Sequence, residues 1–235
     1  MIKNEYYYEM NELANECRRE WFINENVPID IFNVIMNKFD DVTIVFMNME
    51  NISGASTIIG KSKLIFINSK ESYARQRFNI AHELYHLRFD NRSVTCTGEE
   101  NKENENKADQ FASCLLLPHG ALCHYEKINH LKNNWTLEDI INAEQFFQIS
   151  HQAFIWRLRL LEKITFEDYN KFKVSIKNKA LNMGYDTKLY QPYHETNCTM
   201  GSYINKVNKL FDKDLISPGL RDELLLDAFY YDKVW

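Results

Sequence analysis

The segment His82-Glu83-Leu84-Tyr85-His86 constrains this chain more than any other feature of its sequence. We expect it to lie in a helix over residues 72–89, because Ile80 and Leu84 recur on the side opposite the two histidines. Residues four apart share one face of a helix, so both imidazoles can reach a single metal ion. Glu83 lies one position round from this pair, where a carboxylate can hold a water molecule. The segment therefore predicts part of a metal site.

Each histidine also has a purely structural interpretation. A single buried histidine is more often a core residue with satisfied hydrogen bonds than a metal ligand. Here His82, His86 and Glu83 would all lie on one buried helix, and each would need its own partner. One metal ion satisfies them together, so we favour the metal site.

A third ligand is predicted about twenty residues downstream. A catalytic zinc needs three protein ligands, and the HExxH segment supplies only two. A second helix is expected over residues 103–117, ended by Pro118. Glu105 lies at the edge of its apolar face, where a carboxylate is out of place unless something binds it. The alternative is an acidic residue that the N-terminal end of the helix dipole favours. Taken with HExxH, Glu105 is the predicted third ligand.

Several neighbours of Glu105 receive roles in the same prediction. Asp109 lies one turn further on, where it could bind the free ring nitrogen of a ligand histidine and fix its tautomer. Glu103 competes as third ligand, although it lies outside the apolar face. His119 and His124 follow Pro118 and are predicted to lie at the surface or behind the ligands.

The remaining pattern predicts an α+β fold. A helix is expected over residues 1–24, and Pro28 ends it before a second helix that includes Ile31 and Phe39. Residues 42–47 and 63–68 are rich in β-branched and aromatic side chains and predict two strands. Ser53-Gly54 predicts a turn between them. Strands followed by the HExxH helix indicate a small sheet packed on active-site helices.

Composition limits the class of protein. The 235 residues, 45% of them hydrophobic, are enough for one core plus a smaller subdomain. The net charge of -5 gives no general attraction for nucleic acid or anionic membranes. The longest apolar runs are too short to span a bilayer. The first residues lack the pattern of a signal peptide, and five cysteines without CxxC spacing fit free thiols. We therefore expect a cytoplasmic protein.

Several segments together resemble the ImmA/IrrE metallopeptidases, in the order found in that family. Residues 75–86 (RQRFNIAHELYH) are similar to its signature RxRFTxAHELGH, and residues 105–118 to its ExxANxFAxxLLMP helix. Three positions in these two segments depart from the family pattern: Tyr85 stands in place of Gly, Asn79 in place of Thr and Asp109 in place of Asn. The other similar segments are residues 27–31 (VPIDI), 65–68 (IFIN), 148–153 (QISHQA), 157–158 and 201–217.

The resemblance implies a zincin-like metallopeptidase core over residues 1–124, with a small mixed or antiparallel sheet, and a mainly helical region over 125–235. It implies a zinc-dependent endopeptidase in which His82, His86 and Glu105 hold Zn²⁺ and Glu83 acts as general base. Mn²⁺ or Fe²⁺ also suits these ligands. The implied substrate is a regulatory protein, typically a neighbouring helix-turn-helix repressor. Its cleavage would derepress genes of a mobile element or stress response.

The sequence leaves the groups that contact substrate open. Tyr85, Tyr73 or one of the pair Arg75 and Arg77 could assist the reaction. The two arginines have a second interpretation, as salt bridges on the helix surface, which we favour. The strand at residues 64–68 could provide an edge to which an extended substrate adds by main-chain hydrogen bonds.

Two rival functions are considered. Residues 135–161 could form a DNA-binding helix-turn-helix in which Ser150 caps the second helix and Arg157 and Arg159 face phosphate. The alternative is a helical hairpin packed on the core, which we favour because the chain is acidic. The second rival is a non-catalytic anti-repressor module that binds its repressor and keeps the metal only as structure. Glu83 argues against it, because a structural site has no use for that carboxylate.

Overall fold

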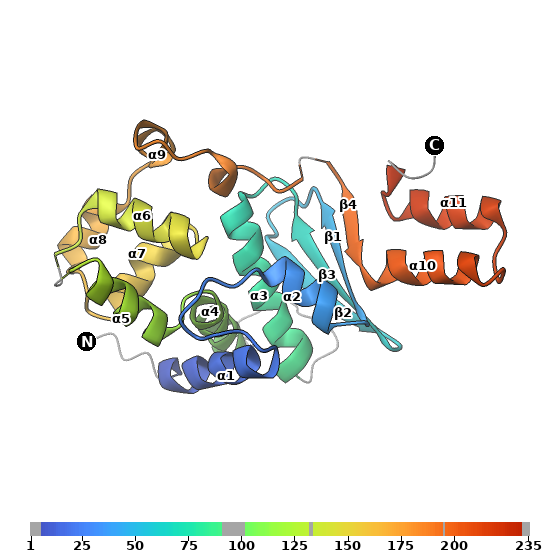
Figure 1. The fold of residues 1–235 in the computed structure, drawn as a ribbon, viewed down its shortest axis with the longest axis horizontal. Helices are drawn as coiled ribbons and strands as arrows, with labels where there is room; N and C mark the ends of the chain where they lie inside the picture. The colour runs from blue at the N-terminus through green and yellow to red at the C-terminus, as the bar shows by residue number, and fades with distance from the viewer. Residues whose placement is uncertain (1–5, 91–101, 132–133, 195, 232–235) are drawn as a thin grey trace.

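The computed structural model describes residues 6–90, 102–131, 134–194 and 196–231 (Figure 1). The elements of the first half are α1 (Tyr7–Glu20), α2 (Ile31–Lys38), β1 (Val42–Met47), β2 (Gly54–Ile59), β3 (Ser62–Asn68), α3 (Tyr73–Phe89) and α4 (Lys102–Leu116). The second half contains α5 (His119–Ile128), α6 (Leu137–Phe147), α7 (His151–Leu160), α8 (Phe166–Phe172), α9 (Lys177–Asn182), the 3-10 helix η2 (Lys188–Tyr190), β4 (Cys198–Gly201), α10 (Ser202–Asp212) and α11 (Pro218–Asp227).

A four-stranded mixed sheet of order β2-β3-β1-β4 lies in the middle of the molecule (Figure 1). β1 and β3 run parallel, whereas β2 pairs antiparallel with β3 and β4 pairs antiparallel with β1. The predicted α+β class with a small mixed sheet is confirmed. The predicted docking edge is wrong, because β3 is paired on both sides and the strand at that edge is β2.

Two of the four strands, β2 and β4, were not predicted from the sequence. Ser53-Gly54 was expected to be a turn, but Gly54 begins β2, whose sequence GASTII shows no regular alternation. β4 comes from the far end of the chain, and Cys198 pairs opposite Phe46. Gly201 adopts φ 103°, and a Cβ there would lie 2.6 Å from the Val42 carbonyl oxygen, so this close approach requires glycine. The helical region thus contributes a strand to the sheet; the predicted boundary near residue 124 stays a prediction.

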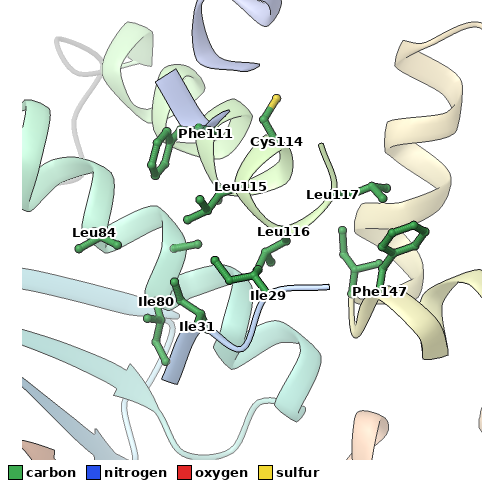
Figure 2. Close-up of a cluster of buried hydrophobic side chains, with 14 of the residues drawn as sticks. Ile29, Ile31, Ile80, Leu84, Phe111, Cys114, Leu115, Leu116, Leu117 and Phe147 are labelled. Carbon is green, nitrogen blue, oxygen red and sulfur yellow. The ribbon is translucent and has the colours of Figure 1, made fainter. Parts of the chain in front are cut away.

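The core forms where α3 and α4 meet the sheet. α3 packs on β2 and β3, and α4 packs against α1 and α3. Figure 2 shows Ile80 and Leu84 of α3 in one cluster with Phe111 and Leu115 of α4. Ser72 caps α3 by accepting a hydrogen bond from the Arg75 N–H, so the helix begins within one residue of its predicted start. The HExxH segment is therefore fixed in a rigid helix.

Helices α6 and α7 form the helical hairpin that we favoured over a DNA-binding helix-turn-helix. Ser150 caps α7 by accepting a hydrogen bond from the Ala153 N–H, as expected. Arg157, however, is fully buried and donates to Cys114 Sγ at 3.1 Å and to the Leu117 carbonyl oxygen at 2.9 Å. A buried guanidinium with these partners cannot face phosphate. The burial of Arg157 contradicts the rival interpretation in which it faces DNA.

Helices α10 and α11 project from the end of the sheet away from α5–α8 (Figure 1). α10 contacts β1 and β4, and α11 contacts α10. Within the described ranges, no helix combines the length and the apolar character needed to cross a bilayer.

A buried ion pair joins α6 to α7. Glu144 Oε2 lies 2.9 Å from His151 Nδ1, and His151 Nε2 donates to the Phe172 carbonyl oxygen at 2.7 Å. Both partners are acceptors, so His151 carries two protons when Glu144 is ionised. Burial by itself lowers the pKa of His151, but the hydrogen bond and charge of Glu144 raise it overall. The stability from this raised pKa is fully present below pH ~6.5 and is lost as the pH rises through the folded pKa.

We expect His151→Gln to lower the free energy of unfolding by about 3 kcal/mol at pH 6, because it removes the cation that faces the buried Glu144 carboxylate and leaves the Tyr190 hydroxyl as its hydrogen-bond donor. The difference from the parent should shrink as the pH is raised to 9. Urea unfolding at both pH values measures it. The exposed pair Lys179–Glu138, with side chains 42% and 56% exposed, provides the control. Lys179→Gln should change little at either pH, and a His151→Gln difference that grows with pH would contradict the assigned pair.

Candidate metal centre

His82, His86 and Glu105 come together at one point between α3 and α4. Each offers one donor atom, and these atoms all lie within 4.8 Å of one another. The two Nε2 atoms lie 3.2 Å apart, and the Glu105 carboxylate oxygens lie 3.2 Å from His82 Nε2 and 3.6 Å from His86 Nε2. Among the described residues, this is the only group of three or more such side chains that could hold a metal ion. The three predicted ligands are therefore brought together.

Each histidine is held by an aspartate on its other ring nitrogen. His82 Nδ1 donates to Asp109 Oδ1 at 2.9 Å, which matches the partner expected for Asp109. His86 Nδ1 donates to Asp90 Oδ2 at 3.1 Å. Such bonds leave both Nε2 atoms directed at the shared point. Asp90 was not predicted as a partner of His86, although its position four residues after His86, directly after the last residue of α3, was a usable signal.

Hydrogen bonds set the charges of the centre. Burial alone lowers the pKa of His82, but hydrogen bonds to Asp109 and Glu105 raise it to about 10. The hydrogen bond from His82 lowers the pKa of Glu105. A metal ion would take the place of the proton that His82 carries here, since ligands bind in their deprotonated form.

Glu83 is 5% exposed and belongs to the same cavity. Burial raises the pKa of its carboxyl. Ser56 Oγ donates to Glu83 Oε2 at 2.7 Å, and a Cβ on Gly54 would lie 3.0 Å from Glu83 Oε1. Gly54 and Ser56 belong to β2, a strand that was not predicted, so nothing in the sequence pattern indicated these two residues.

The competing ligands lie elsewhere. Glu103 is 62% exposed and its Oε1 lies 2.8 Å from Lys107 Nζ, outside the cluster. His119 Nδ1 lies 3.0 Å from the Tyr7 hydroxyl. His124 lines a different cavity. Of the acidic and histidine candidates weighed for the third ligand, Glu105 alone has the required position.

Four side chains were candidates for substrate contact, and Arg75 is the one that lines the cavity. It also makes the expected surface pair, with Nε 3.7 Å from Glu71 Oε1. Tyr85 is buried with its ring 5.6 Å from those of Phe89 and Phe111.

Tyr73 and Arg77 are directed to another part of the core. The Tyr73 ring stacks on Phe32 at 5.6 Å, and Arg77 is buried and donates to the Ile29 carbonyl oxygen. Neither they nor Tyr85 line the cavity. The roles considered for these three residues, including a surface salt bridge for Arg77, are therefore wrong.

The centre opens into a cavity of about 600 Å³. It is lined by the loop before β2, the first residue of β2, helices α3, α4 and α7, and one residue of α8. A larger cavity of about 760 Å³, between α5 and α6, contains none of the three convergent donors. We assign the chemistry to the smaller cavity, because convergent donors and a buried carboxylate define a site better than size does. Its lining residues are Asn51, Ile52, Ser53, Gly54, Arg75, Phe78, Asn79, His82, Glu83, His86, Glu105, Asn106, Asp109, Gln110, Ser113, Gln152, Ala153, Trp156, Leu160 and Tyr169.

Comparison with known proteins gives one family. Residues 40–159 match the family described as "Peptidase_M78: IrrE N-terminal-like domain". No curated protein matches the chain significantly. A solved structure described as a Mycobacterium tuberculosis transcriptional regulator is similar over 66% of this chain, with 16% sequence identity and a TM-score of 0.47. The chain covers 48% of the length of that structure.

Proposed function

Because the chain belongs to the IrrE N-terminal-like family of peptidases, we propose that it is a metal-dependent endopeptidase with a zincin-like core. One observation carries the proposal: the donor atoms of His82, His86 and Glu105 lie within 4.8 Å of one another, beside the buried carboxylate of Glu83. The core would consist of the sheet with α3 and α4. The region after residue 124 would support it and add β4.

The donor set fits a catalytic ion. Two imidazoles and one carboxylate are the ligands of many zinc peptidases, and they leave a position for a reactant. The aspartate behind each histidine supplies the orientation that such ligands need. We propose Zn²⁺, and the same ligands also suit Mn²⁺ or Fe²⁺.

Glu83 would be the general base of the reaction. When bound, zinc lowers the pKa of water to about 7 and polarises a carbonyl group. Glu83 Oε1 would accept a proton from the attacking water and then donate it to the leaving amine. Ser56, bonded to the other carboxylate oxygen, would hold that side chain in place. The raised pKa of the Glu83 carboxyl suits a group that must both accept and donate a proton.

The proposed substrate is a regulatory protein, a helix-turn-helix repressor whose cleavage derepresses genes. The family resemblance of residues 75–86 and 105–118 supports this proposal. An extended segment of the substrate would add to the edge strand β2, whose first residue lines the cavity. The rival anti-repressor function without catalysis is disfavoured by the buried Glu83, which no structural metal site needs. Direct DNA binding is disfavoured by the buried Arg157.

Metal analysis tests the ligand assignment. We expect protein purified without added metal to contain about one ion per chain, and Glu105→Ala to lose most of it, because two imidazoles alone bind zinc weakly. Inductively coupled plasma mass spectrometry measures the content. Glu103→Ala, two residues earlier on the same helix and with an exposed side chain, is the matched control and should keep its metal. Unchanged occupancy in Glu105→Ala would rule out Glu105 as a ligand.

Asp90 should matter for affinity but not for the number of ions bound. We expect Asp90→Ala to weaken metal binding about 10–100-fold, because His86 loses the acceptor that fixes its ring. Competition with a chromophoric chelator measures the dissociation constant. Asp90→Asn retains an acceptor oxygen and should lose less. Equal affinity of Asp90→Ala and the parent would show that the hydrogen bond does not orient His86.

A further inference from the structure

Trp156 is an exposed aromatic side chain beside the candidate metal centre. It lies on α7, is 41% exposed, and lines the same cavity as His82, His86 and Glu105. Its neighbour Arg157 is fully buried, so the two residues point to different environments. A large aromatic surface left open to solvent is costly, and in a cavity it commonly contacts a ligand.

Other apolar side chains extend this surface. The ring of Tyr169, from α8, lies 5.8 Å from that of Trp156 in an edge-to-face arrangement. Leu160 of α7 and Phe78 of α3 line the same cavity. We call Phe78, Trp156, Leu160 and Tyr169, three of which are aromatic, the aromatic wall. Three of the four come from α7 and α8, outside the elements that carry the metal donors.

One polar group of the cavity has an acceptor atom without a partner in the described part of the chain. Gln110 lines it, and its side-chain Oε1 is buried without a hydrogen-bond partner among the described residues. A buried acceptor of this kind costs free energy until a donor reaches it. A peptide N–H is such a donor.

Charge does not select the substrate side chain. Glu83, Glu105 and Asp109 line the cavity, and the lining Arg75 together with a bound Zn²⁺ would offset them. Apolar contact with the aromatic wall is therefore what distinguishes one substrate side chain from another.

We propose that the aromatic wall is the specificity determinant of the peptidase: it binds a large apolar side chain next to the scissile bond, while Gln110 accepts a hydrogen bond from the substrate main chain. This inference rests on the proposed function, because it assigns the substrate class of that site. A large apolar side chain is buried in most folded proteins. The substrate segment is therefore a linker or locally unfolded stretch that exposes such a residue.

A cleavage assay tests the wall through selectivity. Zinc-loaded protein is incubated with blocked peptides that differ in one central residue, Ala, Leu, Phe or Asp, and products are identified by mass spectrometry. We expect the parent to prefer Leu and Phe over Ala and Asp. Trp156→Ala should lower kcat/KM for the Phe peptide about 10-fold or more, because 1–3 kcal/mol of apolar contact corresponds to roughly 10–200-fold. The Ala peptide should be nearly unaffected.

Two variants serve as controls. Trp156→Phe keeps an aromatic ring and should retain most of the preference. Tyr8→Ala removes another exposed aromatic ring, 81% exposed on α1 and outside the cavity, and should leave the selectivity unchanged. If Trp156→Ala lowered kcat/KM equally for all peptides, the role of Trp156 would be structural and the inference would be overturned.

A binding assay separates this inference from the proposed function. Zinc-loaded Glu83→Gln protein is titrated with the same peptides by calorimetry, so no cleavage is needed. We expect the Phe peptide to bind tighter than the Ala peptide, and the difference to vanish when Trp156→Ala is added. Equal affinity for both peptides would contradict the proposed role of the aromatic wall, whatever the cleavage result. Preferential binding without any cleavage by the parent supports the wall and rejects the peptidase.

Discussion

Glu83→Gln is expected to reduce peptide-bond hydrolysis about 10³-fold or more, the range that general-base catalysis contributes. The amide cannot accept the proton of the attacking water, although it has nearly the same size and shape as the carboxylate. It can still accept the hydrogen bond that Ser56 Oγ now donates to Glu83 Oε2 at 2.7 Å. Product formation from a peptide pool, followed by mass spectrometry, measures the loss. Metal content and thermal stability should stay close to those of the parent, because Glu83 is not one of the three convergent donors.

The same variant separates a peptidase from an anti-repressor. If the protein acts by cleaving its repressor, Glu83→Gln should still bind the repressor but leave it intact, and the target genes should stay repressed. Asn106→Ala is a suitable control, because Asn106 lines the same cavity on α4 without a place in the donor cluster. It should keep hydrolysis within an order of magnitude of the parent. Full derepression by Glu83→Gln would exclude a hydrolytic mechanism and favour binding alone.

The parts of the centre that could be predicted from sequence are those set by local spacing. His82 and His86 share a helix face because they lie four residues apart, and Glu105 and Asp109 share the next helix for the same reason. The pattern of apolar residues on α4 was enough to show which side faces α3. Within each helix, short-range geometry fixes the relation of these residues, whereas the meeting of the two pairs depends on the packing of α3 against α4.

The parts that could not be predicted depend on contacts between distant segments. Ser56 and Gly54 reach Glu83 only because β2 lies against α3, and the sequence of β2 carries no alternation that marks it as a strand. β4 is four residues long and pairs with a strand more than 150 positions earlier in the chain. No periodicity connects the two, so the sheet order could not be inferred.

The errors around α3 have a different cause. Tyr85 and Arg77 belong to a helix that is buried on nearly all sides. When both faces of a helix are covered, periodicity does not show which face borders a cavity and which borders the core. Tyr85 therefore looked like a substrate contact although it packs between Phe89 and Phe111. The same ambiguity made Arg157 look like a DNA contact, and its burial leads to a second strong expectation.

Arg157→Ala should lower the free energy of unfolding by about 3–5 kcal/mol, measured by urea denaturation. The substitution removes a fully buried side chain, which leaves a cavity, and it deprives the Leu117 carbonyl oxygen of its donor at the end of α4. The guanidinium also lies 4.8 Å from the centre of the Tyr7 ring, so contacts to α1 are lost as well. Arg157→Met restores most of the volume but not the donor and should cost clearly less.

The comparison with an exposed arginine decides between packing and nucleic-acid binding. Arg19→Ala, at a side chain that is 53% exposed in a surface ion pair, should change stability little. If α7 were a recognition helix, Arg157→Ala would instead leave stability unchanged and reduce salt-sensitive DNA binding in a gel shift. A helix whose basic residue is fixed inside the core presents its other side to the cavity. The position of Trp156 beside the metal centre thus depends on the buried anchor next to it, and the loss of Arg157 should weaken peptide selectivity even at temperatures where the chain remains folded.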